Sequence, residues 1–86
     1  MEDNVVFIGD KRYSSYVWII MNKIEKSPVI LKTRGKHIYN AVNIAEFLSR
    51  TKNLKIQDIK ISSSVFKSEK DNKERRVPEI EIILKK

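Results

Sequence analysis

Cysteine is absent from this 86-residue chain, which excludes disulfides, thiolate zinc sites and cysteine nucleophiles. Its absence is compatible with a reducing intracellular compartment. The two glycines, Gly9 and Gly35, are too far apart to form a phosphate-binding glycine-rich loop. No apolar run approaches the ~18 residues needed to cross a bilayer, and no signal-peptide pattern opens the sequence. These absences predict a cytoplasmic protein without a membrane span.

Catalytic groups are also scarce. His37 is the one histidine, and it has no cysteine or second histidine with which to build a metal site or a nucleophile–base pair. Glu79 and Glu81 lie two residues apart on a predicted strand and therefore share a sheet face. There they are expected to be partners for lysines of a neighbouring strand rather than an acid–base pair. We expect no enzyme, no metal, no cofactor and no small-molecule substrate.

Positive charge and apolar residues, by contrast, are well represented. Eighteen Lys and Arg against eleven Asp and Glu give a net charge of +7, and 41% of the residues are hydrophobic. This apolar content is typical of a folded chain rather than a disordered tail. The length predicts one domain over residues 1–86. Because a chain of this size buries only ~60–65% of its unfolded surface, we expect oligomerisation to supply further apolar burial.

Two strands and the helix between them are predicted in the first part of the chain. Residues 4–8 form a β-branched run typical of a strand buried on both faces, and residues 29–35 form a second strand. Between them a helix over residues 12–26, which Asp10 is placed to cap, has apolar residues at helical spacing. Additional apolar residues predict that this helix is covered on more than one side; they are Trp18, Ile19 and Met21.

A second helix, expected over residues 37–52, has one apolar stripe, formed by Ile38, Ala41, Val42, Ala45 and Leu48. Ile44 and Phe47 lie beside this stripe. They are candidates for a dimer or partner surface, although lone apolar residues on a helix flank are common.

The last third of the chain alternates with a period of two. Residues 54–66 alternate apolar and polar side chains, with a slip at Gln57 and Asp58 that predicts a β-bulge. A charged decapeptide follows, and residues 77–85 alternate again, so we expect a β-hairpin with a long arm over about residues 62–77. The order β-α-β-α-β-β predicts an α/β (α+β) two-layer sandwich, in which two helices cover one face of a four-stranded mixed sheet.

Basic residues gather at two predicted strand-to-helix turns. Both strands run into helices in the same way, so their ends should share one edge of the sheet. Scattered solubilising lysines are the alternative, but clustering at helix starts favours anion binding, and a phosphate backbone fits such a surface best. The residues of this predicted basic surface are Lys11, Arg12, Lys32, Arg34 and Lys36.

The predicted arm has a second set of cations. One interpretation is an arm that follows a nucleic-acid groove, and the other is a mobile charged loop with no role. No aromatic residue lies in the segment 67–76, so contacts there should involve phosphates and groove walls rather than stacked bases. The arm residues predicted to bind nucleic acid are Lys70, Lys73, Arg75 and Arg76.

Taken in order, these segments resemble the Alba family, small basic nucleic-acid-binding proteins of archaeal chromatin. The opening N-V-V-F-I-G-D-K resembles a strand followed by Gly-Lys-Lys, and Tyr16-Val17 falls at the family's Tyr-Val. The segment 31–42, L-K-T-R-G-K-H-I-Y-N-A-V, resembles K-x-R-G-x-x-I-x-x-A-V, and residues 76–86 resemble the closing strand. The resemblance implies the β-α-β-α-β-β fold and a homodimer whose arms clasp the minor groove. It also implies binding to double-stranded DNA with little sequence preference, and in many members to RNA.

The family's motifs carry over to this chain with three departures. Asp10 stands at the first lysine of Gly-Lys-Lys, whose acetylation weakens DNA binding in some members, so that switch is expected to be absent. Arg12 stands where proline is usual and restores a positive charge nearby, and Asn40 stands where some members have lysine. The positions that match the family's basic motifs are Lys11, Lys32, Arg34, Gly35 and Lys36.

Three functions follow from the sequence. The first is a dimeric architectural protein of the chromosome, located in the nucleoid, that coats, compacts or bridges duplex DNA through phosphate contacts. The second is an RNA-binding protein, either an RNA chaperone or a subunit of an RNA-processing particle. The third is a protein-interaction module that uses Ile44 and Phe47, with charge serving only solubility.

Overall fold

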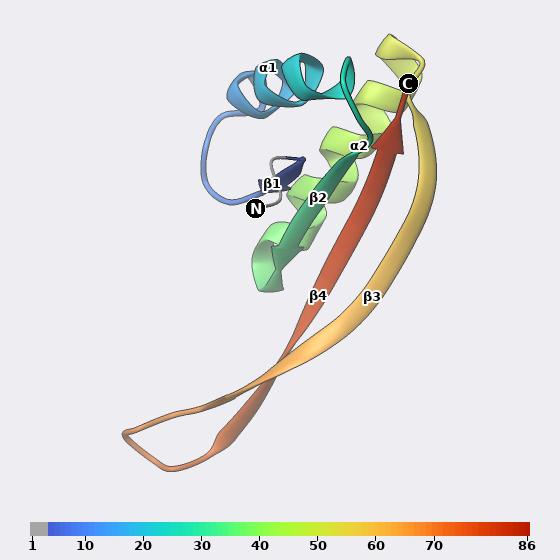
Figure 1. The fold of residues 1–86 in the computed structure, drawn as a ribbon. Coiled ribbons are helices and arrows are strands. Elements are labelled where there is room, and N and C mark those ends of the chain that lie inside the picture. Colours follow the sequence, from blue (N-terminus) through green and yellow to red (C-terminus); the bar gives the residue numbers. More distant parts are fainter. Residues whose placement is uncertain (1–3) are drawn as a thin grey trace.

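The computed structural model describes residues 4–86, which form two α-helices on one side of a four-stranded sheet (Figure 1). The elements are β1 (Val5–Phe7), α1 (Tyr13–Ile24), β2 (Val29–Arg34), the 3-10 helix η1 (Gly35–His37), α2 (Ile38–Lys52), β3 (Lys55–Lys67) and β4 (Glu74–Lys85). The sheet order is β1-β2-β4-β3; β1 and β2 run parallel, and the other neighbouring strands run antiparallel. This confirms the predicted element order and two-layer architecture. The domain predicted over residues 1–86 includes residues 1–3, which lie outside the described residues.

β1 lies at the edge of the sheet and is covered on one face only. Val6 is buried against the helices, whereas Phe7 is 70% exposed on the opposite face. The expectation of a strand buried on both faces is therefore wrong. Both helices lie on the same side of the sheet, so the other face of this edge strand stays open to solvent (Figure 1).

α1 differs from its prediction at its start and on its outer face. Arg12 occupies the N-cap position and makes no side-chain capping bond. The predicted cap by Asp10 is wrong, because its carboxylate lies beside His37 instead. Of the three residues expected to be covered, Ile19 and Met21 are partly buried against the core, whereas Trp18 is 70% exposed; no further layer packs over that side of α1 in the described chain. The residues that α1 buries are Tyr16, Ile20 and Ile24.

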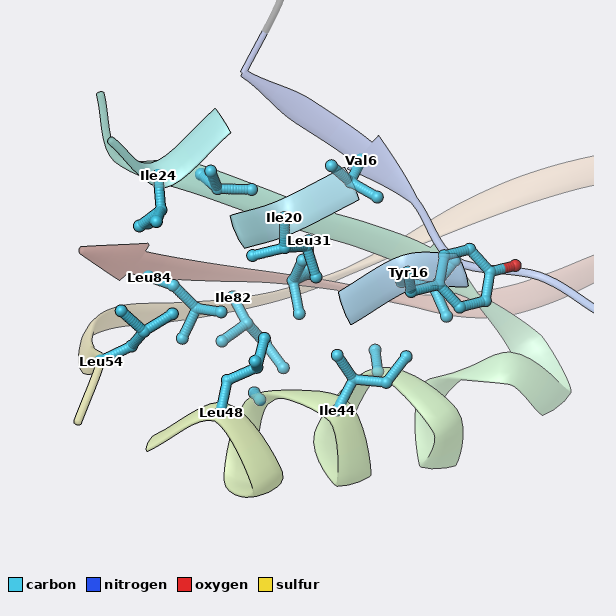
Figure 2. Close-up of a cluster of buried hydrophobic side chains, with 14 of the residues drawn as sticks. Val6, Tyr16, Ile20, Ile24, Leu31, Ile44, Leu48, Leu54, Ile82 and Leu84 are labelled. Carbon is cyan, nitrogen blue, oxygen red and sulfur yellow. The ribbon is translucent and has the colours of Figure 1, made fainter. Parts of the chain in front are cut away.

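α2 corrects two expectations about its faces. Ile44, predicted to lie on a partner surface, is fully buried, because α1 packs beside α2 and Ile44 fills the space between the helices (Figure 2). Val42, predicted to lie on the core stripe, is 45% exposed and borders a groove between α2 and β3. Phe47 is 39% exposed and remains accessible to a partner.

The core lies between the sheet and the two helices (Figure 2). Within β2 and within β4, successive side chains point to opposite faces of the sheet, so every second residue faces the helices. Burying one large aliphatic side chain contributes about 1.5–3 kcal/mol, so this shared core holds the strand ends and the helix starts in fixed positions. The largest fully buried side chains are Ile20, Leu31, Ile44, Leu48, Ile82, Leu84 and Val29.

β3 and β4 continue beyond the body as a two-stranded arm (Figure 1). A register shift between Ile56 and Asp58 confirms the predicted bulge. Pairing extends to Lys67 and Glu74, so the predicted arm, residues 62–77, is a paired ribbon except for its closing turn. A short turn over residues 68–73 closes it.

Among the described residues, no helix is long and apolar enough to cross a membrane. The described His, Asp and Glu side chains form no group of three that could hold a metal ion. Within the same residues, each buried side-chain nitrogen or oxygen has a hydrogen-bond partner.

Candidate nucleic-acid interface

β1 and β2 end side by side at one edge of the sheet. Phe7 and Lys32 pair in parallel register, and the backbone N–H of Ile8 donates to the Lys32 carbonyl oxygen at 3.0 Å. The buried hydroxyl of Thr33 donates to the Ile8 carbonyl oxygen at 2.7 Å. These bonds bring the turn after β1 and the turn after β2 to the same edge, as the topology argument predicted.

Tyr16 fixes the turn between β1 and α1. Its buried ring places the hydroxyl oxygen where it accepts from the backbone N–H of Gly9 at 2.7 Å and of Lys11 at 3.1 Å. Asp10 lies between these two residues, and its Oδ1 is 3.6 Å from Nε2 of His37, at the start of α2. The first turn is therefore tied to the core below it and to the second turn beside it.

The second turn contacts the base of the arm. Gly35 has a φ of +63°, which residues with a side chain rarely adopt, and a Cβ there would lie 3.5 Å from Cγ1 of Val77 in β4. The Arg34 guanidinium carbon is 4.8 Å from the centroid of the Phe66 ring in β3. A cation over an aromatic face is attracted by about 0.5–1 kcal/mol at an exposed site. Arg34 is thus positioned between the turn and the arm.

The predicted body cations occupy two settings. Lys11, Arg12, Arg34 and Lys36 are exposed on the two turns, and we call these four residues the rim. Lys32 instead lies on the open face of the sheet, where its Nζ is 3.3 Å from Oε1 of Glu81. Its charge is therefore partly countered, and the rim provides the stronger positive field.

The predicted arm cations are exposed beyond the body of the protein. Arg75 and Arg76 are neighbours on a strand and therefore point to opposite sides of the ribbon. Arg76 Nη1 donates to the Ser63 hydroxyl oxygen at 3.3 Å. Lys70 and Lys73 lie in the closing turn, 68–73. The arm thus presents cations on both sides and at its end.

Sequence reasoning missed the aromatic residues of this interface. Phe66 lies under Arg34, and Phe7 borders a hollow of about 360 Å³ at the end of β1 and β2. Phe7 could have been found: β1 alternates, so a residue between buried Val6 and Ile8 faces the other side. The contact of Phe66 with Arg34 joins two distant elements, and no local pattern signals it. The residues that line the hollow are Phe7, Ile8, Lys32, Thr33, Arg34, His37 and Glu79.

A groove of about 350 Å³ lies between α2 and β3, away from the rim. Its apolar lining includes Val42, Ile56 and Ile59, which are 45%, 41% and 50% exposed. At its margin Arg50 Nε donates to Glu46 Oε2 at 2.8 Å. This hydrogen bond, and the attraction of the two charges, lower the pKa of Glu46 and raise that of Arg50.

These features define a class: small basic α+β proteins with cations at two strand-to-helix turns and a two-stranded arm. The Alba family model matches residues 4–63. The chain is 38% identical to the DNA/RNA-binding protein Alba of Picrophilus torridus, over 96% of each protein. It is 34% identical to the DNA/RNA-binding protein Alba 1 of Archaeoglobus fulgidus, over 100% of this chain and 99% of the relative. The chain belongs to the Alba family, which confirms the resemblance seen in the sequence.

Solved structures agree with this assignment. Alba from Thermoplasma volcanium has a TM-score of 0.82 and 28% identity to this protein, covering 96% of this chain and 100% of the other. ALBA1 from Trypanosoma brucei has a TM-score of 0.81 over 100% of this chain and 71% of its own, and at 21% identity it shares the fold. The curated relatives named above are called nucleic-acid-binding proteins rather than enzymes, in agreement with the expected lack of catalysis.

Proposed function

We propose that this protein binds nucleic acid and acts as a homodimer that coats, compacts or bridges double-stranded DNA in the nucleoid. One observation carries the proposal: the exposed cations of two turns distant in sequence lie at one edge of the sheet, beside the base of the arm. The names of the relatives, DNA/RNA-binding proteins, support it.

The rim would contact phosphates rather than bases. Its side chains are long, exposed cations, and contacts of this kind position a protein on a duplex without reading its sequence. The backbone amides at the start of α1 add partial positive charge at the same edge. We therefore expect affinity to depend on salt and to be nearly independent of sequence.

The arms would follow the minor groove. A two-stranded ribbon is narrow, and the arm presents exposed cations on both sides, so it can contact the phosphates that border a groove. The arm begins beside Arg34, which pairs with Glu79 in β4 opposite Ser62 of β3, so body and arm would bind one continuous stretch of the duplex.

The homodimer would form through the groove between α2 and β3. Exposed Val42, Ile56 and Ile59 form one apolar surface there, and a second copy related by two-fold symmetry would bury the same residues. We expect sedimentation at tens of micromolar to give a dimer for the wild type and a monomer for Ile59→Glu. Trp18→Glu, on the exposed side of α1, should remain dimeric. A wild-type monomer would remove this part of the proposal.

A mobility-shift assay on unrelated duplexes tests the DNA contact. Arg34→Ala should weaken binding to every duplex by a similar factor, because it removes a phosphate contact. Lys26→Ala removes an equal charge just after α1, away from the rim, and should have a smaller effect. A loss that depends on the sequence of the duplex would contradict phosphate-only contact.

RNA binding is the second candidate, favoured by the relatives' names, in which DNA and RNA stand together. Competition between matched duplex DNA and duplex RNA separates the two. A large preference for RNA would replace the chromatin role with that of an RNA chaperone or an RNA-processing subunit. If neither duplex binds at ~0.1 M salt, where non-specific binders still show weak affinity, a protein-interaction module becomes the better description.

A further inference from the structure

We propose that the hollow at the ends of β1 and β2 binds one unpaired nucleobase of a single strand, which stacks on the exposed ring of Phe7. This inference rests on the proposed function, because it places a second kind of nucleic-acid contact beside the rim. It extends the ligands of that surface from duplexes to single-stranded segments of RNA or DNA.

Phe7 is an aromatic surface on a rigid support. Its side chain is 70% exposed, whereas its neighbours Val6 and Ile8 are 5% and 4% exposed and lie in the core. The backbone on either side is held by pairing with β2, through the register of Phe7 with Lys32 and the bond from Ile8 N–H to Lys32 O. The ring is thus presented to solvent by a strand rather than by a loop, which suits a stacking surface.

The hollow beside Phe7 has the size and chemistry for a base. Its volume of about 360 Å³ lies in the range of small-ligand sites, ~300–1,000 Å³. The Glu79 carboxylate can accept from an exocyclic amino group of a base, and the His37 ring offers a nitrogen for a further hydrogen bond. Lys32 and Arg34, which also line it, can neutralise the flanking phosphates.

Arg34 connects the stacking site to the rim. Its guanidinium lies over Phe66, 4.8 Å from the ring centroid, which limits its freedom and holds its charge next to the hollow. A strand whose phosphate contacts Arg34 would therefore bring an adjacent base to Phe7. A base inside a duplex has both faces covered by its neighbours, so only an unpaired base can offer a face to this ring.

Binding titrations with a single-stranded oligonucleotide of mixed sequence, as RNA and as DNA, and with the matched duplex test the site. Loss of one base–aromatic stack lowers affinity by about 5- to 140-fold, so Phe7→Ala should weaken single-strand binding by that factor and change duplex binding less than about twofold. Phe7→Tyr keeps the ring and should bind as the wild type does. Trp18→Ala is the matched control, because Trp18 is also 70% exposed but lies on α1, away from the hollow.

A second readout reports the stack directly. The fluorescence of 2-aminopurine in the single strand should be quenched by wild-type protein and by Phe7→Tyr, and less so by Phe7→Ala and Phe7→Leu. Phe7→Leu keeps the apolar bulk and serves if the alanine variant fails to fold in a thermal melt. A loss of affinity with RNA, DNA or both supports the proposal. The oligonucleotide with which the loss occurs shows whether the bound base comes from RNA or from DNA.

The outcomes separate this inference from the proposed function. Unchanged single-strand affinity in Phe7→Ala, together with weakened duplex binding in Arg34→Ala, overturns the stacking site and leaves the proposed function in place. Equal losses for single strand and duplex in Phe7→Ala, or a loss in Trp18→Ala as large as that in Phe7→Ala, also overturn it. A wild-type protein that binds no nucleic acid overturns both.

Discussion

Asp10 places a negative charge in the first turn of the proposed interface, and removing that charge should strengthen DNA binding. The carboxylate is exposed, follows Gly9 and precedes rim residues, with its Oδ1 3.6 Å from Nε2 of His37. Asp10→Asn retains the size of the side chain and an oxygen that can face His37. The substitution therefore removes repulsion of phosphate while changing the turn as little as the chemistry allows.

The effect can be worked from the rim charges. Four rim cations and Asp10 give 4 − 1 = +3 for each protomer, or +6 for the proposed dimer. With a slope of about −0.9 for each neutralised phosphate, the rims contribute about −5 to the slope of log K against log salt in the wild type and about −7 in the variant, whose rims total +8; the arm cations add equally to both. Between about 0.1 and 1 M salt the variant should lose roughly sixtyfold more affinity, so the variant is the tighter binder at low salt.

Anisotropy titrations of one labelled duplex over a salt series measure both slopes. Glu25→Gln is the matched control: it changes the net charge of the chain equally, but Glu25 lies just after the end of α1 and pairs with Lys86 at 2.6 Å. Its slope should equal that of the wild type. Identical slopes for wild type and Asp10→Asn, or an equal steepening by Glu25→Gln, would refute the reasoning that local rim charge governs binding.

Three further predictions concern the stability of the fold. Ile44→Ala should lower the free energy of unfolding by about 2–5 kcal/mol, and Phe47→Ala, at a 39% exposed position, by much less; urea denaturation measures both. Gly35→Ala should lower the free energy of unfolding by about 1–2 kcal/mol in the same assay, because a positive φ is strained for alanine and not for glycine. The Arg50 hydrogen bond lowers the pKa of Glu46, so this pair stabilises the fold above the unfolded carboxyl's pKa and ceases to do so as pH falls through the folded pKa. Between neutral and acid pH, the melting temperature should fall further for the wild type than for Glu46→Gln.

The layout of the fold could be predicted because it rests on local repetition. Alternation in β2 and β4 and the helical spacing in α1 and α2 determine which residues enter the core, and the order of elements then brings the ends of β1 and β2 to one edge. The slip at Gln57 was visible because the apolar positions on either side of it are out of phase. Each of these inferences uses neighbours in the chain.

The errors arose where a second element decides the environment. Ile44 is buried because α1 packs beside α2, and the apolar stripe of one helix does not contain that information. Phe7 is exposed because both helices lie on one face of the sheet. The helical spacing of α1 is enough to bury the ring of Tyr16, but the hydrogen bond that its hydroxyl accepts from the Lys11 backbone depends on how the preceding turn folds.

The bulge at Gln57 determines which way the side chains of β3 face, both at the groove beside α2 and along the arm. Ile56 before it and Ile59 after it both line the groove beside α2, although an unbroken alternation would turn them to opposite sides. Phe66 lies an odd number of residues beyond Ile59, so the alternation of the strand turns it to the opposite face, where it meets Arg34. A single residue inserted or deleted between the bulge and the tip would turn every later side chain of β3 to the reverse side, with the composition almost unchanged. The length of this strand, as much as its chemistry, therefore decides which side of the ribbon is turned towards the rim.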